Sequence, residues 1–275
     1  MTSDPLFTGP ELCGLEAHEI VTLLKAKEIS SADLIDAAVA RIDQTGPVIN
    51  ATPTLCEARA RAVDLSNQDT TPAGYLAGLP ITIKDLNAVA NVRTTFGTKR
   101  LADFIPQHND PLVDQLERQG AVILGKTNTP EFGAGGNTFN DVFGQTRNPW
   151  NTALNPGGSS GGAAASLAAG EIWLSHGSDH GGSLRTPAAY CGIVGLRPSP
   201  GIAGGPGQDT AFIIEGVQGP MARSVRDCAL FLDAMSGFDP QIAISYPSPE
   251  IPYQEAVIRS EEKLKIAFAP DLGGF

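Results

Sequence analysis

The sequence predicts an α/β protein with a mixed, largely parallel β-sheet covered by helices on both faces. Short apolar runs typical of buried strands alternate with longer segments whose apolar residues recur at helical spacing. No internal repeat or linker divides the 275 residues. We therefore expect a single domain over residues 1–275.

The first part of the chain is expected to form three helices. Residues 16–45 carry two apolar stripes at helical spacing and so predict two helices. Ser30 or Ser31 would cap the second of these, and Gly46-Pro47 would end it. A third helix is expected over residues 55–66.

Residues 78–84 then change to the pattern of a strand. Ile81 and Ile83 would face one side of the sheet, and Thr82 and Lys84 the other. Lys84 would lie at the carboxyl end of this strand, where open α/β sheets place their ligand sites.

The rest of the chain continues the alternation, interrupted by a glycine-rich stretch over residues 125–162. We expect helices over 110–119, 162–169 and 224–236, and strands over 121–124, 171–175, 192–197 and 264–269. A last strand in a doubly covered sheet is normally followed by a covering helix, so we expect a C-terminal part to be missing.

Composition and charge limit the partners and the cell compartment that the sequence predicts. The formal net charge is -11, which disfavours direct binding to nucleic acid. The four cysteines form no C-x-x-C pair and indicate reduced thiols in a reducing compartment. The start of the chain lacks a signal sequence, and no stretch approaches the ~20 apolar residues of a membrane helix. The prediction is a cytoplasmic protein that does not bind membranes.

Three segments carry candidate chemistry. Lys84 ends an apolar strand, Ser159 and Ser160 lie in the glycine-rich run Gly157–Gly162 ahead of a predicted helix, and Ser183 follows two glycines. A serine becomes a good nucleophile only beside a base and near backbone N–H groups that bind the oxyanion. Each segment is weak evidence alone, because strand-end lysines are usually solvated and glycine pairs occur in ordinary turns.

Together these segments resemble the amidase signature family, whose catalytic triad is Ser-cisSer-Lys. Lys84 matches the family lysine, Ser159 the bridging serine that follows a cis peptide bond, and Ser183 the nucleophile. The flanking segments 125–133 and 185–192 also look like family segments.

The resemblance implies an amidase that cleaves the C–N bond of a linear carboxamide through an acyl-enzyme on Ser183, with Ser159 and Lys84 relaying protons. It also implies an oxyanion hole or substrate-binding surface made by Gly133, His180, Gly181 and Gly182. No metal or organic cofactor is expected. The expected partner is a small amide, and a homodimer is compatible with the prediction.

Two features depart from the family pattern. Members usually run well past this length, and the position of His180 more often carries a smaller or aliphatic residue. The length leaves one alternative open, a catalytically incompetent fragment or scaffold. A second alternative is a glutaminase-type subunit of a tRNA-dependent amidotransferase.

Other motif matches fail on their context. Residues 120–127 fit the P-loop pattern, but they read as a strand, and Pro130 interrupts any following helix. Residues 158–162 fit the nucleophile-elbow pattern with Ser160 as nucleophile, but no strand is expected directly before them. His176 and His180 are four residues apart with Gly177 between them, which does not favour a metal pair.

Overall fold

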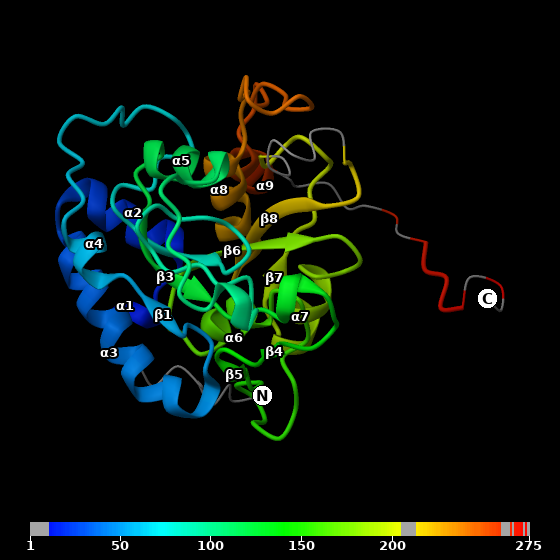
Figure 1. The fold of residues 1–275 in the computed structure, drawn as a ribbon. Helices are drawn as coiled ribbons and strands as arrows, with labels where there is room; N and C mark the ends of the chain where they lie inside the picture. The colour runs from blue at the N-terminus through cyan, green and yellow to red at the C-terminus, as the bar shows by residue number, and fades with distance from the viewer. Residues whose placement is uncertain (1–10, 205–212, 260–264, 266, 272, 274–275) are drawn as a thin grey trace.

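A computed structural model describes residues 11–204, 213–259, 265, 267–271 and 273 (Figure 1). Its main sheet has six strands in the order β1-β3-β2-β6-β8-β7. These strands are β1 (Thr54–Leu55), β3 (Val122–Thr127), β2 (Pro80–Lys84), β6 (Leu174–Asp179), β8 (Val217–Ala222) and β7 (Val194–Gly195). A separate two-stranded ribbon pairs β4 (Phe139–Asn140) with β5 (Gly144–Gln145).

The three central strands of the main sheet are parallel, and antiparallel strands flank them. In register, β2 places Lys84 opposite Thr127 of β3 and Ile81 opposite Leu174 of β6. Every residue of β2 and β3 is buried, as expected for parallel strands that are covered on both faces. The α/β fold class predicted from the sequence is confirmed.

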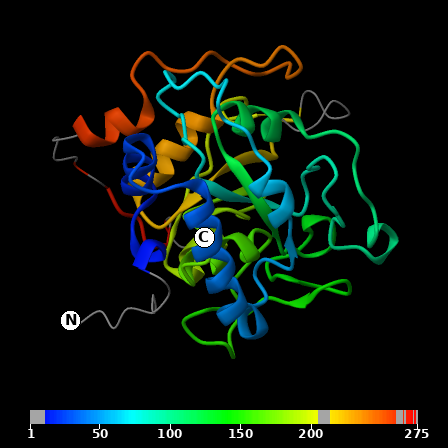
Figure 2. The same ribbon diagram turned by 90° about the vertical axis from the view of Figure 1, so that its left-hand side faces the viewer.

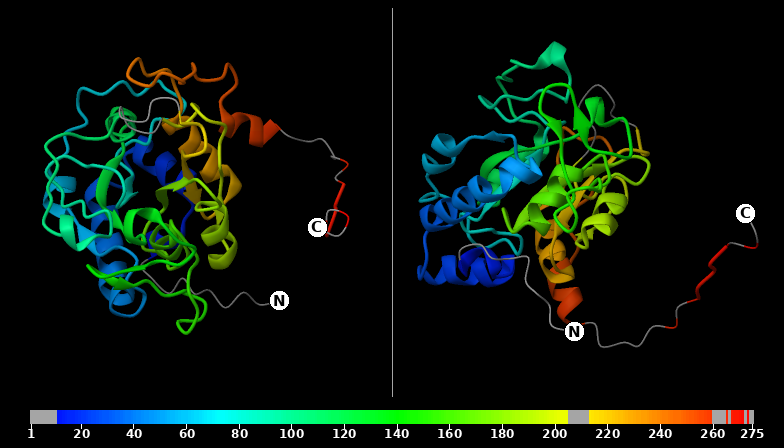
Figure 3. Two further views of the ribbon diagram at one scale, coloured as in Figure 1. Left: turned by 45° about the vertical axis from the view of Figure 1, so that its right-hand side comes forward. Right: turned by 90° about the horizontal axis from the view of Figure 1, so that it is seen from below.

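Helices cover both faces of this sheet. In Figure 1, α8 lies above β6 and β8, whereas α6 and α7 lie below them. Figure 2 shows α3 on the outside of the molecule, and Figure 3 shows α2 and α3 gathered on the side opposite α7. The helices are α1 (Glu11–Gly14), α2 (Ala17–Ala26), α3 (Ser31–Ile49), α4 (Glu57–Arg61), α5 (Pro111–Arg118), α6 (Gly161–Ala168), α7 (Arg185–Cys191), α8 (Val225–Met235) and α9 (Tyr253–Arg259), with short 3-10 turns at Lys99–Leu101 and Glu131–Gly133.

Both helices predicted over residues 16–45 are present, but the second one ends later than predicted. Ser30 caps α3 through a reciprocal pair of hydrogen bonds with Asp33. The helix does not stop at Gly46-Pro47, because it continues to Ile49 and includes Pro47. Ile49 packs against Ala165 and Ala169 in a small apolar cluster, so burial favours a further helical turn despite the proline.

Two other predicted boundaries are wrong. The helix expected over 55–66 is reduced to α4, because Leu55 pairs with β3 and the Asp64 carboxylate accepts a bond from Ser66 N–H beyond the helix. The strand expected over 171–175 instead runs from Leu174 to Asp179, because β8 pairs along its whole length.

Two strands predicted in the later part of the chain also differ from what the structure shows. The strand expected over 192–197 is reduced to the two residues of β7. Positions 264 and 266 of the strand expected over 264–269 lie outside the described residues, whereas its other four residues are in no strand. Phe268 is 86% exposed, so the described residues of this segment are not covered as a strand of the sheet would be.

No helix in the described part of the chain is long and apolar enough to cross a lipid bilayer.

We predict that Gly162→Ala destabilises the protein by about 2 kcal/mol, because overpacking of a filled interior costs that much. A Cβ at Gly162 in α6 would lie 2.4 Å from Asn128 N and 2.7 Å from Ala51 O, both of them backbone atoms. Urea unfolding measures the change. The matched control is Gly46→Ala in α3, where the nearest atom would be Ile42 Cγ2 at 3.9 Å; equal losses for both variants would contradict the prediction.

Candidate active site

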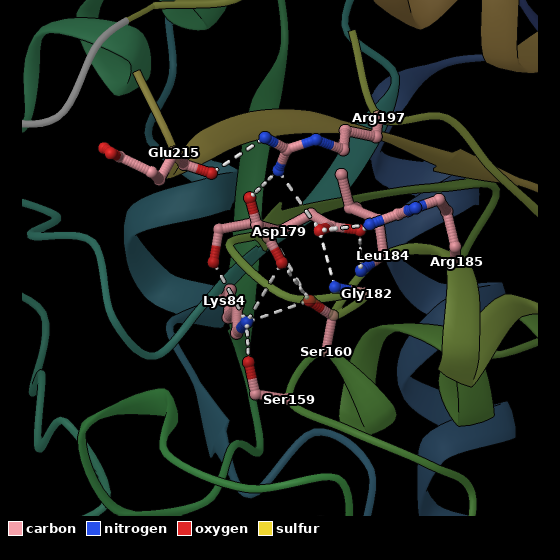
Figure 4. A network of polar contacts seen from close by, with 10 residues as sticks. Lys84, Ser159, Ser160, Asp179, Gly182, Leu184, Arg185, Arg197 and Glu215 are labelled. Carbon is pink, nitrogen blue, oxygen red and sulfur yellow. Dashed lines mark hydrogen bonds and ion pairs between the residues drawn. The ribbon is translucent and has the colours of Figure 1, made fainter. Parts of the chain in front are cut away.

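A buried lysine side chain lies at the centre of the site. Lys84 ends β2 and has no exposed surface. Its Nζ lies 2.7 Å from Ser159 Oγ, 2.9 Å from Ser160 Oγ and 3.0 Å from Ser178 Oγ (Figure 4). Three hydroxyl groups from two segments therefore surround one amino group, and no carboxylate in the described residues forms an ion pair with it.

Burial changes the protonation of this lysine. Desolvation lowers the pKa of Lys84 to about 7, against a smaller opposing effect from the negative charge of Asp179. Hydroxyl groups stabilise an ammonium less than a carboxylate would, so the loss of water is only partly compensated. Near neutral pH a large fraction of this amine is uncharged and able to accept a proton.

The segment before α6 brings Ser159 and Ser160 to the lysine. The Gly158–Ser159 peptide bond is cis, as the motif predicts. Gly157 has a φ of +80°, and a Cβ there would lie 2.9 Å from Pro187 Cα. Glycine is required at that position because the segment packs directly on the backbone of α7.

The end of β6 supplies both Ser178 and a carboxylate that organises the following loop. Asp179 is 1% exposed and accepts hydrogen bonds from Gly182 N at 2.8 Å and Leu184 N at 3.1 Å. Its carboxylate also pairs with Arg185 Nε at 3.0 Å and Arg197 Nη1 at 3.2 Å. Figure 4 shows Asp179 between the two guanidinium groups.

The carboxylate of Asp179 stays charged despite its position. Burial acts to raise the pKa of Asp179, but hydrogen bonds from Arg185 and from the N–H groups of Gly182 and Leu184 outweigh it. The pKa therefore lies well below its ordinary value. This fixed charge holds residues 179–185, the loop that carries Ser183.

The backbone of Ser183 is hydrogen-bonded to the serine pair. Ser160 N donates to Ser183 O at 3.2 Å, which connects the two glycine-rich segments. Ser183 is partly exposed, and its hydroxyl forms no hydrogen bond among the residues described. Catalytic hydrogen bonds are often long or absent without substrate and tighten in the complex.

The residues predicted to bind an oxyanion differ in exposure and in whether their N–H groups already have an acceptor. His180 and Gly181 are exposed at the start of the loop. The Gly182 N–H instead donates to Asp179, so in this arrangement it is not available to an oxyanion. A buried carboxylate next to a glycine loop competes for its N–H groups, and the sequence pattern did not reveal this competition.

Gly133 lies against the serine pair from another direction. Its φ is +71°, and a Cβ there would lie 2.7 Å from Leu86 Cδ1 and 3.5 Å from Ser159 Oγ. The turn at Gly133 therefore lies next to Ser159, and any side chain there would collide with Leu86.

A second buried lysine lies on the neighbouring strand and differs in its partners. Lys126 in β3 is unexposed and its Nζ contacts Asp85 Oδ1 at 3.0 Å, with Asn87 O and Thr94 Oγ1 each at 2.8 Å. This residue is the lysine of the P-loop match, so that pattern describes a strand with an internal ion pair. The elbow match also fails, because Ser160 is fully buried and bound to Lys84.

Metal binding has one geometric candidate in the described residues, at the start of α2. Ligand atoms of Glu16, His18 and Asp227 lie within 4.8 Å of one another. The Asp227 carboxylate already accepts bonds from Ala17 N, His18 N and His18 Nδ1 at 2.7–2.9 Å. The cluster is explained by helix capping and lies on a different element from the lysine site.

The sequence did not identify Ser178 and Asp179 as site residues. Ser178 and Asp179 precede the glycine pair in the run Gly177–Ser183, and an acidic residue beside a glycine pair was the available signal. Their contribution depends on β6 extending to Asp179, which the strand predicted over 171–175 did not include.

Comparison with known proteins agrees with this geometry. Residues 33–275 match the family model described as Amidase. A glutamyl-tRNA(Gln) amidotransferase subunit of Moorella thermoacetica is 43% identical over 261 residues, covering 93% of this chain and 53% of that protein.

Two solved structures share the fold. The 6-aminohexanoate cyclic dimer hydrolase complexed with substrate aligns with a TM-score of 0.81 at 32% identity, covering 93% of this chain and 53% of that one. A bacterial aryl acylamidase of the amidase signature enzymes aligns with a TM-score of 0.80 at 35% identity, covering 88% and 51%. The chain thus spans about half the length of the relatives it matches.

We predict that Asp179→Asn flattens the acid side of the stability profile. The pKa of Asp179 is lower in the folded protein than in the unfolded chain, so its stabilising contribution is present above about pH 4 and is lost as pH falls toward the folded value. Urea unfolding at several pH values checks this. The variant should be less stable at pH 7, and the difference from the original protein should shrink below pH 4; a constant difference would show that the charge is not responsible.

Proposed function

This chain belongs to the amidase family, and we propose that it hydrolyses a carboxamide through an acyl-enzyme on Ser183, with Ser159 and Lys84 as the proton relay. The observation that carries the proposal is the unexposed Lys84 amine, whose pKa is about 7 and whose Nζ lies 2.7 Å from Ser159 Oγ. A buried neutral amine beside a serine is a general base at neutral pH.

The hydrogen bonds around Lys84 support the direction of proton transfer. A neutral amine has two N–H donors and one lone pair. Ser160 Oγ donates to Ser178 O at 3.2 Å, so it accepts from Lys84 Nζ at 2.9 Å. If Ser178 Oγ accepts the second N–H at 3.0 Å, the lone pair of the amine faces Ser159.

The proposed reaction follows from this orientation. Lys84 Nζ takes the proton of Ser159 as Ser159 Oγ takes the proton of Ser183. Ser183 Oγ attacks the amide carbon, and the carbonyl oxygen becomes an oxyanion. The C–N bond then breaks while Ser159 donates its proton to the leaving nitrogen and takes back the proton that Lys84 Nζ had accepted, which leaves Lys84 neutral again. Water attacks the resulting ester by the same relay, releasing the carboxylate and restoring Ser183.

Backbone N–H groups of the nucleophile loop are proposed to bind the oxyanion. His180, Gly181 and Ser183 are the candidates, since the Gly182 N–H is held by Asp179. Donors of this kind contribute about 3 kcal/mol each to transition-state stabilisation. Asp179 acts as a positioning residue, because it fixes the loop without facing the reacting atoms.

A second candidate function uses the same acyl-enzyme. The 43% identity to a glutamyl-tRNA(Gln) amidotransferase subunit over 93% of this chain favours a glutaminase whose released ammonia passes to a second subunit. Two measurements separate the candidates: which amides are hydrolysed, and whether other subunits co-purify. Glutamine hydrolysis restricted to a purified complex would favour the amidotransferase, whereas turnover of simple amides by the chain alone would favour the amidase.

We predict that a fluorophosphonate labels Ser183 and that Ser183→Ala abolishes both the labelling and amide hydrolysis while leaving the unfolding curve unchanged. The reason is that Ser183 would carry the acyl group. Peptide mass mapping identifies the labelled serine. A label on Ser160 would contradict the relay, and a folded protein that takes no label would favour a catalytically incompetent fragment.

We predict that the acylation rate rises with pH and levels off above about pH 7, because the neutral form of Lys84 is the active one and its pKa is about 7. Lys84→Ala should slow acylation by about 100-fold or more, which is the usual contribution of a general base. Lys84→Arg should do no better, since a guanidinium stays charged. Lys25→Arg on α2 is the control; near-normal acylation by Lys84→Arg would mean that Lys84 acts only as a positive charge.

A further inference from the structure

A cavity of about 240 Å³ lies directly beside the catalytic group of residues. Ser178, whose Oγ lies 3.0 Å from Lys84 Nζ, forms one part of its wall. Leu86, which packs against the Gly133 turn, forms another. The cavity wall therefore includes one residue that contacts the proposed base and one that contacts the turn next to Ser159, so a group attached to the scissile amide could reach the cavity.

The charged groups in the cavity wall are unequally compensated. Asp179 is part of the wall, but Arg185 and Arg197 neutralise it. Asp110 also lines the cavity, and its Oδ2 accepts a hydrogen bond from Ala88 N at 3.0 Å. Within the described ranges no cation forms an ion pair with Asp110, and the nearby Lys126 is bound to Asp85.

The other polar side chains in the wall differ in whether they already have hydrogen-bond partners. Gln218 Oε1 already contacts Asn87 Nδ2 at 2.9 Å and His176 Nε2 at 2.6 Å. His180 also lines the cavity, and it is exposed three residues before Ser183. An imidazole and an incompletely compensated carboxylate thus line one small space.

We infer that this cavity is a subsite for a primary ammonium group of the substrate, bound by the Asp110 carboxylate and the His180 imidazole. A carboxylate in a part-buried position attracts a cation and repels an anionic group. The volume of about 240 Å³ fits a short aminoalkyl group. The inference rests on the proposed function, because the subsite is defined by its position beside Ser178, whose Oγ lies 3.0 Å from Lys84 Nζ.

Two pairs of amides of equal size test the inference and show on which side of the scissile bond the ammonium lies. β-Alaninamide and butyramide differ on the acyl side, whereas N-(2-aminoethyl)acetamide and N-propylacetamide differ on the leaving-group side. Asp110→Asn keeps an acceptor for Ala88 N but removes the charge. The Asp110→Asn variant should have a kcat/KM about tenfold lower for the ammonium member of one pair, mainly because KM rises. For the neutral member of that pair, its kcat/KM should fall by less than about twofold.

The matched control is Asp114→Asn, the same change one turn along α5, where the side chain is exposed and bonds Asn109. Because the His180 N–H is also an oxyanion-hole candidate, His180→Ala is judged by the ratio of kcat/KM between the two members of a pair. This ratio should fall as in Asp110→Asn, whereas His108→Ala, a change at an exposed histidine outside the cavity wall, should leave it unchanged. Equal effects of Asp110→Asn on both members of each pair would overturn the inference.

A binding measurement separates failure of the subsite from failure of the proposed function. In the Ser183→Ala protein, the imidazole proton resonances of His180 are assigned by their loss in His180→Ala, and each amide is titrated in. We expect shifts with the ammonium compounds of one pair and not with their neutral partners. Such shifts, together with no amide hydrolysis by the unsubstituted protein, would refute the proposed function but keep the subsite. The absence of a shift with either ammonium compound would overturn the subsite even if the unsubstituted protein hydrolyses amides.

Discussion

The burial of one amino group among hydroxyls, without a carboxylate partner, is the constraint on which this site depends. Lys84 and Lys126 lie at the carboxyl ends of neighbouring parallel strands and are both unexposed. Lys126 has the Asp85 carboxylate at 3.0 Å, whereas Lys84 has only serine oxygens. Desolvation acts on both lysines, but only Lys84 lacks the ion pair that would hold its proton. The choice of neighbour, more than depth, distinguishes the candidate base from the lysine that forms an internal ion pair.

The negative charge of Asp179 is compatible with a neutral Lys84 amine because other groups bind the Asp179 carboxylate. Its negative charge acts to raise the pKa of Lys84, which would oppose a basic role. Two guanidinium groups and two N–H groups bind this carboxylate. The same interactions define the loop that carries Ser183. A single buried anion thus shapes the loop while its charge is largely compensated by arginine.

The sequence predicted the parts of the protein that depend on local pattern. The strand ending at Lys84, the helix capped by Ser30, the helix predicted over 224–236 and the glycine-rich approach to α6 follow from periodicity and capping. It did not predict β8, whose Gly219-Pro220 pair reads as a turn, because pairing with β6 decides that segment. The site shows the same division: Lys84, Ser159 and Ser183 were found by motif, whereas Ser178 and the capture of the Gly182 N–H by Asp179 depend on tertiary contacts.

The spacing of the site along the chain has a consequence for where the low pKa of Lys84 comes from. Lys84 meets Ser159 across 75 residues and Ser178 across 94. The amine is therefore enclosed only when β2, β6 and the segment before α6 are assembled around it. An amine that is not enclosed is hydrated and has the pKa of an ordinary lysine. The low pKa of Lys84 is thus a property of the assembled fold and not of the strand that carries the residue.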